Sequence, residues 1–279
     1  MARYGMAIDL DRCIGCYNCQ VACKDEHVGN DFTPIAKAQP TFGHFWMGLK
    51  EQERVLSDAH IRVYYYPHMC NHCDDAPCIK AAKGGSVYKR NDGIVIVDPE
   101  KSVGQKQLVE ACPYGAIFWN EELNIPQKCT FCAHLLEEGW SVPRCVQTCP
   151  TDCLIFGDLD DPESRISKFV AERQPKTLYP EHQTRPRVTY AGLPRPIVSG
   201  TVVKADNEEC GEGARVELKG QGGTRLEAQA DAYGDFCFNG AVPGKGKLTV
   251  SLEGYNTIEL DTDITSDVTA LGDIVLSKA

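Results

Sequence analysis

The stretch Lys128–Pro150, KCTFCAHLLEEGWSVPRCVQTCP, constrains the fold most strongly because its four cysteines follow a metal-binding pattern. Cys129 and Cys132 form a C-x2-C pair, and Cys145 and Cys149 form a C-x3-C pair followed directly by proline. A C-x2-C loop directs two sulfurs at one metal centre, whereas two sulfurs one helical turn apart can reach different centres. This arrangement is typical of paired iron–sulfur clusters, in which the last cysteine of a motif ligates the other cluster.

A second group near the N-terminus has the run C-x2-C-x2-C-x3-C, formed by Cys13, Cys16, Cys19 and Cys23. Bacterial ferredoxins use this spacing, although Lys24 stands where they have proline. By the same crossing rule, the first three sulfurs of each group bind one cluster and the last binds the other. The first cluster would use Cys13, Cys16, Cys19 and Cys149. The second would use Cys129, Cys132, Cys145 and Cys23.

The middle of the sequence contains an incomplete cysteine group and an isolated cysteine that complete each other. The group CNHCDDAPC, residues 70–78, lacks its fourth cysteine because Ala82 stands there. Cys112 lacks its three preceding partners, which are replaced by Ser102, Gln105 and Leu108. The complete set is Cys70, Cys73, Cys78 and Cys112. Since random loss would scatter the gaps over both sites, the sequence predicts three [4Fe-4S] clusters on a plan with room for four.

Two other uses of cysteine compete with this interpretation. A zinc ribbon also uses C-x2-C pairs, and a disulfide framework also needs many cysteines. Zinc explains neither the proline after Cys149 nor the group near the N-terminus. A disulfide scaffold is disfavoured by the length of the sequence and by the lack of a secretory signal. A zinc-binding scaffold module remains the alternative from another functional class.

Composition and length limit the remaining possibilities. A chain of 279 residues is long enough for about two domains. Its net charge of −10 argues against a nucleic-acid partner, which requires a basic face. No apolar run approaches the ~18–20 residues needed to span a bilayer, and the N-terminus has neither a signal-peptide core nor a twin arginine. We therefore expect a cytoplasmic protein without a membrane span.

Residues 1–157 are predicted to form an α+β, duplicated bacterial-ferredoxin-like core that carries the cysteine motifs. Alternation from Tyr4 to Leu10 predicts a strand ahead of the first motif. Turn residues predict hairpins over 85–101 and 116–125. Residues 25–67 mix glycine, proline and aromatic residues with charges, which indicates an irregular insertion.

The C-terminal part of the sequence has a different pattern. Residues 158–196 are predicted to be a helix followed by a proline-dotted linker, with Asp161 as the helix cap, Pro162 at its first position and an end near Arg173. From residue 197 to 279, seven short strands predict an all-β, Ig-like or transthyretin-like sandwich. Their ranges are 199–204, 214–219, 225–231, 234–239, 246–252, 256–261 and 268–276. This domain has no ligand constellation and is interpreted as a docking module.

Several reactive or charged residues have no assigned ligand role. Cys153 is expected to be a buried structural thiol, and Cys210 and Cys237 are expected to be free rather than disulfide-bonded. Lys128 and Arg144 are candidates for raising a cluster potential, but ordinary screened surface charge is the favoured interpretation. The histidines near the motifs are expected to be structural; they are His68, His72 and His134. We find no catalytic acid–base pair, nucleophile or phosphate loop.

With the cysteine groups placed, about the first 195 residues resemble the iron–sulfur electron-transfer subunits of the dimethyl-sulfoxide-reductase family of molybdenum enzymes. CPYGA beginning at Cys112 and GDLDDP after the last cysteine group support this resemblance. The whole sequence is most similar to the group containing the small subunits of pyrogallol–phloroglucinol transhydroxylase and resorcinol-type hydroxylases. The motifs are GHFWM, DGIVIVDPEK, CPYGAIFWNEE, QKCTFCAHLLEEG, TRPRVTY and GDFCF.

The resemblance implies a non-catalytic electron-transfer subunit. Its partner would be a large subunit that holds a molybdenum bis-molybdopterin-guanine-dinucleotide cofactor and the active site, in a heterodimer or a larger assembly. The expected reaction of that partner is hydroxylation or transhydroxylation of polyhydroxylated aromatics. The alternative is another molybdopterin oxidoreductase that acts on a sulfoxide, an oxyanion or another acceptor. The resemblance also places the first cluster nearest the partner, and the missing fourth cluster favours electron storage or a soluble carrier over a membrane quinone.

Overall fold

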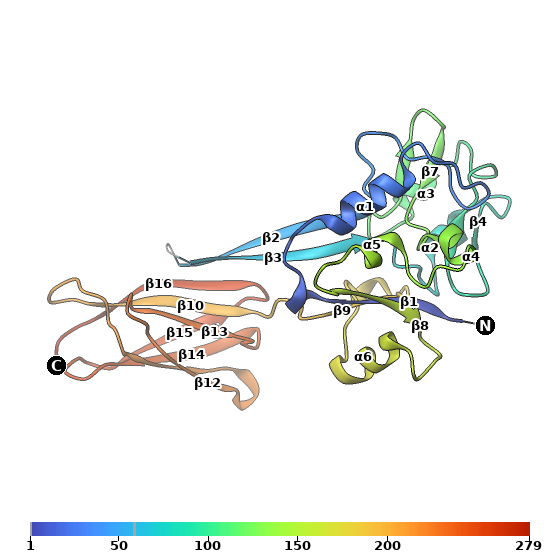
Figure 1. Ribbon diagram of the computed structural model, residues 1–279. Coiled ribbons are helices and arrows are strands. Elements are labelled where there is room, and N and C mark those ends of the chain that lie inside the picture. Colours follow the sequence, from blue (N-terminus) through green and yellow to red (C-terminus); the bar gives the residue numbers. More distant parts are fainter. Residues whose placement is uncertain (1, 58–59) are drawn as a thin grey trace. The chain divides into compact units, whose positions relative to one another are not determined.

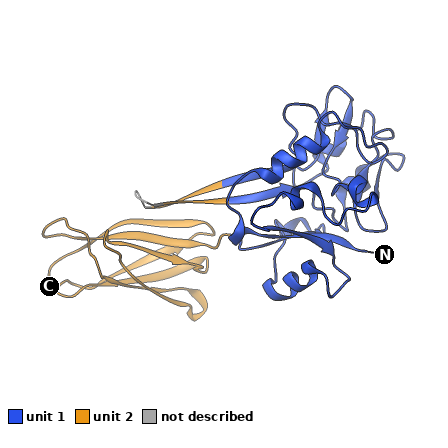
Figure 2. Ribbon diagram, in the orientation of Figure 1, with its two compact units in different colours: residues 1–51, 65–193 blue, residues 52–64, 194–279 orange. Residues whose placement is uncertain are grey.

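The computed structural model describes residues 2–57 and 60–279 of the chain, which divides into two compact units (Figure 2). The first unit contains residues 1–51 and 65–193, and the second contains residues 52–64 and 194–279. The polypeptide therefore passes between the units three times. The predicted α+β class is confirmed, because the first unit mixes short helices with small sheets and the second is built from strands (Figure 1).

A three-stranded sheet in the order β8-β1-β9 belongs to the first unit. Its central strand β1 (Tyr4–Asp9) confirms the strand predicted ahead of the first motif. It pairs antiparallel with β8 (Leu154–Asp158) and parallel with β9 (Val188–Ala191). Helix α6 (Arg165–Arg173) packs on this sheet through its buried residue Ile166. Both α6 and β9 are therefore part of the first unit, although the sequence had suggested a helix and a linker outside the core.

The cysteine motifs lie on short helices and beside two small hairpins. The helices are α1 (Asn18–His27), α2 (Pro77–Ala81), α3 (Gln107–Glu110), α4 (Ala133–Glu137) and α5 (Arg144–Gln147). The hairpins are β4 (Val87–Lys89) with β5 (Val95–Val97) and β6 (Phe118–Asn120) with β7 (Ile125–Gln127), which confirms both predicted hairpins. Two 3-10 turns, η1 (Leu10–Arg12) and η2 (Pro180–His182), complete the unit. No helix in the described ranges is long and apolar enough to cross a bilayer.

The prediction of an irregular insertion over 25–67 is wrong for its second half. Residues 47–69 form a two-stranded hairpin of β2 (Met47–Ser57) and β3 (His60–Met69), whose connecting residues 58–59 lie outside the described part. Met47 and Met69 at its base are buried in the core of the first unit. Farther along, β2 carries the mixed sequence KEQER, so no strict apolar alternation marks it as a strand.

The start of α6 also differs from its prediction. The helix begins at Arg165, and Ser164 caps it by accepting a hydrogen bond from the Ser167 amide at 3.2 Å. Asp161 instead accepts a hydrogen bond from the Glu163 amide at 2.9 Å, which forms a local Asx turn ahead of the helix. An aspartate followed by proline is compatible with a helix cap and with an Asx turn. The Asx turn forms at Asp161 because Ser164, three residues later, caps the helix instead.

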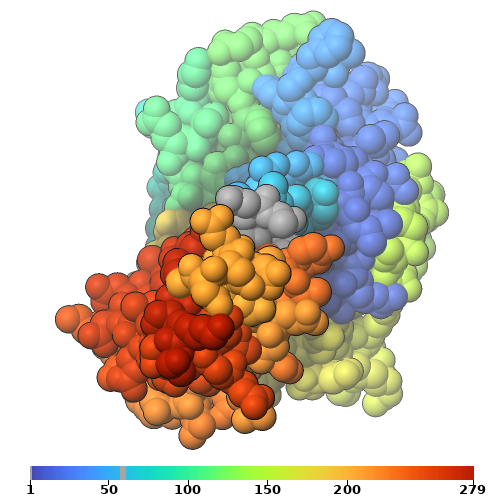
Figure 3. Space-filling view, turned by 90° about the vertical axis from the view of Figure 1, so that its left-hand side faces the viewer, coloured from blue at the N-terminus to red at the C-terminus, as the bar shows by residue number. Residues whose placement is uncertain are grey.

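The second unit is a sandwich of two sheets, in the orders β13-β10-β16 and β12-β11-β14-β15. All seven predicted strands are present: β10 (Ile197–Lys204), β11 (Arg215–Lys219), β12 (Arg225–Gln229), β13 (Asp235–Asn239), β14 (Gly244–Ser251), β15 (Ile258–Ile264) and β16 (Val268–Leu276). A 3-10 turn, η3 (Gln221–Gly223), joins β11 and β12. Alternating side chains such as Val216, Leu218 and Leu248 fill one core between the sheets. Figure 3 shows the sandwich strands of this unit in orange to red.

The distal part of the β2–β3 hairpin belongs to the second unit because polar contacts attach it to the sandwich. The buried side chain of Arg54 forms an ion pair with Asp267 at 2.8 Å and donates to the carbonyl of Arg195 at 2.7 Å. Ser199 donates from its hydroxyl to the carbonyl of Leu56 at 2.5 Å. These contacts fix the hairpin to β10 and to the residues around it.

Candidate metal centres

Three of the four C-x2-C segments, those that begin at Cys13, Cys70 and Cys129, share a left-handed residue at the same position. The residue before the second cysteine has a positive φ in each loop: 68° for Gly15, 44° for His72 and 50° for Phe131. This left-handed turn reverses the direction of the backbone from the first cysteine to the second. At the first loop only glycine fits, because a Cβ on Gly15 would lie 2.6 Å from the ring of Tyr65. The loops therefore have the geometry of repeated copies of one motif.

Backbone amides point at the sulfurs in these loops. The amides of His72 and Phe131 each donate to the sulfur two residues earlier, Cys70 and Cys129, at 3.4 Å. The Gly15 amide makes the equivalent contact with Cys13 and lowers the pKa of that thiol, after the larger effect of a neighbouring thiol. Such hydrogen bonds stabilise a negatively charged sulfur, which is the form that binds iron.

The third predicted site is a cavity lined by all four of its predicted cysteines. Its sulfur-bearing lining residues are Cys70, Cys73, Cys78 and Cys112. Burial, together with the charges of the other three cysteines, raises the pKa of Cys73 to about 12. Cys112 follows α3 and lies far along the sequence from the other three cysteines. The fold brings the four residues together, as their spacing in the sequence predicted.

The cysteines of the second site lie together in the interior. Burial raises the pKa of the Cys145 thiol well above its ordinary value, and the next contributions come from Cys132, Cys23 and Cys129. Cys23 reaches this site from the second half of α1, and Cys145 reaches it from α5, which packs against α1. This neighbourhood contains the four sulfurs that the crossing rule assigned to one cluster.

The first site lies nearer the protein surface than the other two. Burial, together with the charges of Cys13, Cys149 and Cys16, raises the pKa of Cys19 to about 12. Cys16 is exposed, and Cys13 and Cys149 are partly exposed. The four sulfurs of this set therefore also lie close to one another, with one edge of the site open to solvent.

The donor set of each site fits a [4Fe-4S] cluster better than a single ion. Within residues 2–57 and 60–279, no three His, Cys, Asp or Glu side chains converge on a point that would suit one metal ion. Each thiolate of a [4Fe-4S] cluster binds a different iron, so its four sulfurs surround a larger volume. Because burial keeps most of these thiols protonated, cluster binding must release protons.

Cys153 contacts two sulfurs of the first site, a feature that sequence reasoning missed. It is buried, as expected, and its amide donates to the Cys149 sulfur at 3.2 Å. Its thiol also hydrogen-bonds to Cys13, and this contact is the main reason that the pKa of Cys13 falls to about 6. The sequence feature that could have predicted this contact is the position of Cys153 four residues after Cys149, which directs both side chains to the same site.

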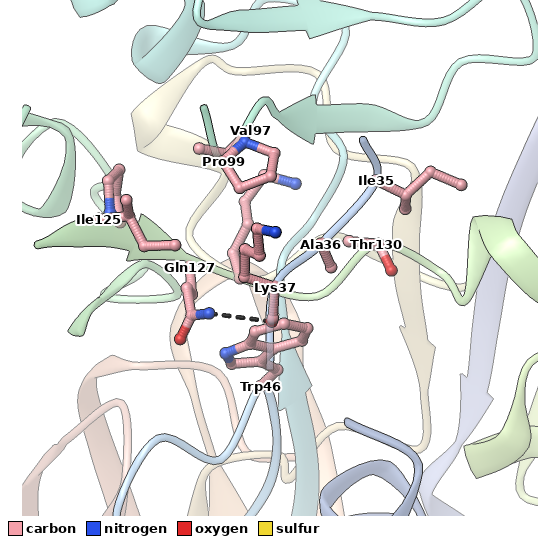
Figure 4. Close-up of a pocket in the computed structure, with 11 residues that line it drawn as sticks. Ile35, Ala36, Lys37, Trp46, Val97, Pro99, Ile125, Gln127 and Thr130 are labelled. Carbon is pink, nitrogen blue, oxygen red and sulfur yellow. Dashed lines mark hydrogen bonds between the residues drawn. The ribbon is translucent and has the colours of Figure 1, made fainter. Parts of the chain in front are cut away.

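The interpretation of Lys128 as a surface charge is wrong. Its side chain is only 2% exposed, and its ammonium donates to the carbonyls of Val95 and, at 3.0 Å, Cys129. It lines the cavity of the third site and also a second, small pocket that Trp46 and Thr130 border (Figure 4). Arg144 is partly exposed and forms an ion pair with Glu26 at 3.2 Å.

The histidines near the motifs have partners or are buried. The Nδ1 atom of His72 accepts a hydrogen bond from the Val95 amide at 3.0 Å, so its proton lies on Nε2. The Nε2 atom of His134 lies 3.0 Å from a Glu26 carboxylate oxygen. Burial lowers the pKa of His68 to about 4. These side chains border the cysteine loops without completing a set of metal ligands.

The positions of the missing fourth site form a packed, hydrogen-bonded structure. Leu108 and Ser102 have no exposed surface. The Gln105 side chain accepts hydrogen bonds from the Lys83 amide and the Ser86 hydroxyl, each at 3.0 Å. Its amide group donates to the carbonyls of Lys83 at 3.2 Å and Lys101 at 2.9 Å. This glutamine therefore joins the two segments that a cluster would otherwise connect.

Comparison with protein families assigns the two parts of the sequence separately. The 4Fe-4S binding domain family matches residues 4–25, and the 4Fe-4S dicluster domain family matches residues 61–159. The carboxypeptidase regulatory-like domain family matches residues 197–277. These matches agree with a ferredoxin-like part followed by a separate β domain, and they contradict the zinc scaffold.

Among individual proteins, the small subunit of pyrogallol hydroxytransferase from Pelobacter acidigallici is 38% identical over 96% of both sequences. A tetrathionate reductase subunit from Salmonella typhimurium is 38% identical over 73% of this chain and 78% of its own length. A subunit of the anaerobic dimethyl sulfoxide reductase of Escherichia coli is 34% identical over 67% of this chain and 87% of its own length. Similarity thus extends over nearly the whole protein in the first case and over about two thirds to three quarters in the others.

Proposed function

The protein belongs to the family of iron–sulfur electron-transfer subunits of molybdopterin oxidoreductases, and on this premise we propose that it carries three [4Fe-4S] clusters for a separate catalytic subunit. The first cluster is assigned to Cys13, Cys16, Cys19 and Cys149. The second is assigned to Cys129, Cys132, Cys145 and Cys23. The third is assigned to Cys70, Cys73, Cys78 and Cys112.

One observation carries the proposed number of clusters. Twelve of the fifteen cysteines fall into three neighbourhoods, each with four sulfurs contributed by separate segments of the sequence. The positions of a fourth site hold a leucine, a serine, an alanine and the hydrogen-bonded Gln105. When bound, a [4Fe-4S] cluster accepts and returns a single electron. The polypeptide's own contribution is to hold each site, direct amides at its sulfurs and exclude water from the second and third sites.

We assign the catalytic chemistry to a partner that holds a molybdenum bis-molybdopterin-guanine-dinucleotide cofactor. The proposed reaction is hydroxylation or transhydroxylation of a polyhydroxylated aromatic compound. The support is that similarity to the pyrogallol hydroxytransferase small subunit includes the β domain, whereas the tetrathionate and dimethyl sulfoxide reductase subunits match a smaller part of the sequence. The second candidate is a reductase of a sulfur compound or an oxyanion, which the names of those relatives support.

The test is anaerobic copurification of the protein with its partner. Iron, acid-labile sulfide and molybdenum are measured in the complex, and the partner is identified by mass. The complex is then assayed with trihydroxybenzenes, sulfoxides and oxyanions under matched conditions. Turnover of trihydroxybenzenes alone supports the aromatic assignment, and turnover of a sulfoxide or an oxyanion alone supports the second candidate. A partner without molybdenum contradicts both.

A further inference from the structure

Lys128 is a buried cation whose charge no side chain balances within the described ranges. Its ammonium donates to two backbone carbonyls, and no carboxylate of residues 2–57 or 60–279 pairs with it. Burying an unpaired charge is strongly unfavourable. The other lysine near this region, Lys89, follows the usual rule, because it forms an ion pair with Asp74 at 3.0 Å. The missing negative charge must therefore come from a group that the polypeptide alone does not provide.

The location of Lys128 indicates which group this is. Its side chain lines the cavity surrounded by Cys70, Cys73, Cys78 and Cys112. Lys128 also directly precedes Cys129, which belongs to the second site. The contact with the Cys129 carbonyl fixes the ammonium between these two sites. No other lysine among the described residues is buried, so the first site has no comparable buried lysine in the described ranges.

We propose that Lys128 is the countercharge of the third cluster and raises its potential above that of the first, which makes the third cluster the preferred resting place of an electron. This inference rests on the proposed three-cluster function. A cluster bound by four thiolates is negatively charged, and one added electron makes it more negative, so a fixed cation nearby favours the reduced state. A lysine charge changes the potential of a cluster more in the low-dielectric interior than at the surface, where salt and water screen it.

This storage role requires the transfer of one electron between two clusters. One electron leaves a neighbouring cluster, which is oxidised by one electron, and the third cluster is reduced by one electron. No bond is made or broken, and no proton is transferred. The function of this residue is to position charge and does not include contact with substrate.

The experiment is an anaerobic redox titration of the full complex, followed by electron paramagnetic resonance. Three variants are compared with the unchanged protein: Lys128→Met removes the charge, Lys128→Arg keeps it, and Lys106→Met removes an exposed lysine. Lys106 is paired with Glu121 at 3.1 Å on the surface. A Cys112→Ser variant identifies the signal of the third cluster by its loss. Iron content is measured for every variant.

In Lys128→Met, the reduced-to-oxidised ratio of the third cluster at a fixed potential should fall about tenfold, which corresponds to about 59 mV for one electron. The second cluster should shift in the same direction by less, and the first should not move. Lys128→Arg should restore most of the shift, and Lys106→Met should cause none. An unchanged third potential, or an equal shift of all three clusters, would overturn the inference.

The unchanged protein gives a second test that does not depend on any variant folding. Its third cluster should be reduced at a higher potential than its first, and the opposite order would overturn the inference even if Lys128→Met failed to assemble. The proposed function fails in a different way. It fails if the unchanged complex has fewer or more than three clusters on this subunit, whatever the order of their potentials.

Discussion

The imidazole of His72 lies against the phenyl ring of Phe131, with ring centroids 3.8 Å apart and planes inclined by 31°. The two residues hold the same position in their C-x2-C loops and have the same left-handed backbone conformation. Their contact therefore packs the loop of the third site against the loop of the second. Phe131 continues this packing to Phe156 of β8, at 5.3 Å between ring centroids.

Replacing Phe131 by alanine should loosen both of these loops. Phe131 is only 1% exposed, and truncation of a buried phenylalanine costs about 3–5 kcal/mol. The denaturation midpoint should fall accordingly, and the second and third clusters should bleach before the first. Phe131→Leu, which keeps most of the volume, should have a smaller effect. Loss of the first cluster ahead of the others would contradict this account of the contact.

Replacing Cys112 by serine should damage the third cluster selectively. Its sulfur lines the same cavity as Cys70, Cys73 and Cys78, although it comes from a distant segment. Iron content should fall by about one third, and the spectra of the first and second clusters should persist. As a matched control, Cys210→Ser changes an exposed cysteine of the second unit and should leave the iron content unchanged. If Cys112→Ser retained all three spectra, the crossing rule would be wrong for this pair.

The ligand pairing could be proposed from the sequence because spacing and gaps are properties of the sequence itself. The absence of cysteine at 82, 102, 105 and 108 predicted one complete site and one lost site. The structure of the lost site was beyond prediction, because the partners of Gln105 come from residues 83, 86 and 101, and no local pattern specifies them.

Replacing Gln105 by alanine should destabilise the fold without changing the iron content. The variant loses four hydrogen bonds of 2.9–3.2 Å and a longer one of 3.5 Å from Gln107. Each contributes about 1 kcal/mol at most sites and less where solvent has access. We expect a loss of about 1–3 kcal/mol in the free energy of unfolding. Gln107→Ala, which removes only the exposed 3.5 Å contact with Gln105, should cost less. Equal effects of the two substitutions would show that the Gln105 side chain does not join the segments.

Replacing Cys153 by alanine should lower the potential of the first cluster and leave the third unchanged. The variant loses the thiol hydrogen bond to Cys13 but keeps the amide that donates to Cys149. Hydrogen bonds to cluster sulfurs stabilise the more negative, reduced state. Cys153→Ser, which retains a donor, should lie between the alanine variant and the unchanged protein. Redox titration of the three clusters gives the result, and an unaltered first potential in Cys153→Ala would contradict the assigned contact.

Two features of the first unit were mispredicted for physical reasons. The β2–β3 hairpin carries charges along much of its length, so its strands lack the apolar alternation that marked the seven strands of the sandwich. Lys128 was expected at the surface because lysine is rarely buried without a partner. Its burial follows from the tertiary packing of Val95 and Cys129 around it, which the neighbouring sequence does not specify.

The most direct test of the central claim is the iron and acid-labile sulfide content of the protein purified without air. The three sets of four cysteines predict about twelve iron atoms and about twelve sulfide ions per polypeptide, with little zinc. About eight or about sixteen iron atoms would contradict the assignment of three sites. Bound zinc without sulfide would contradict electron transfer by this protein altogether.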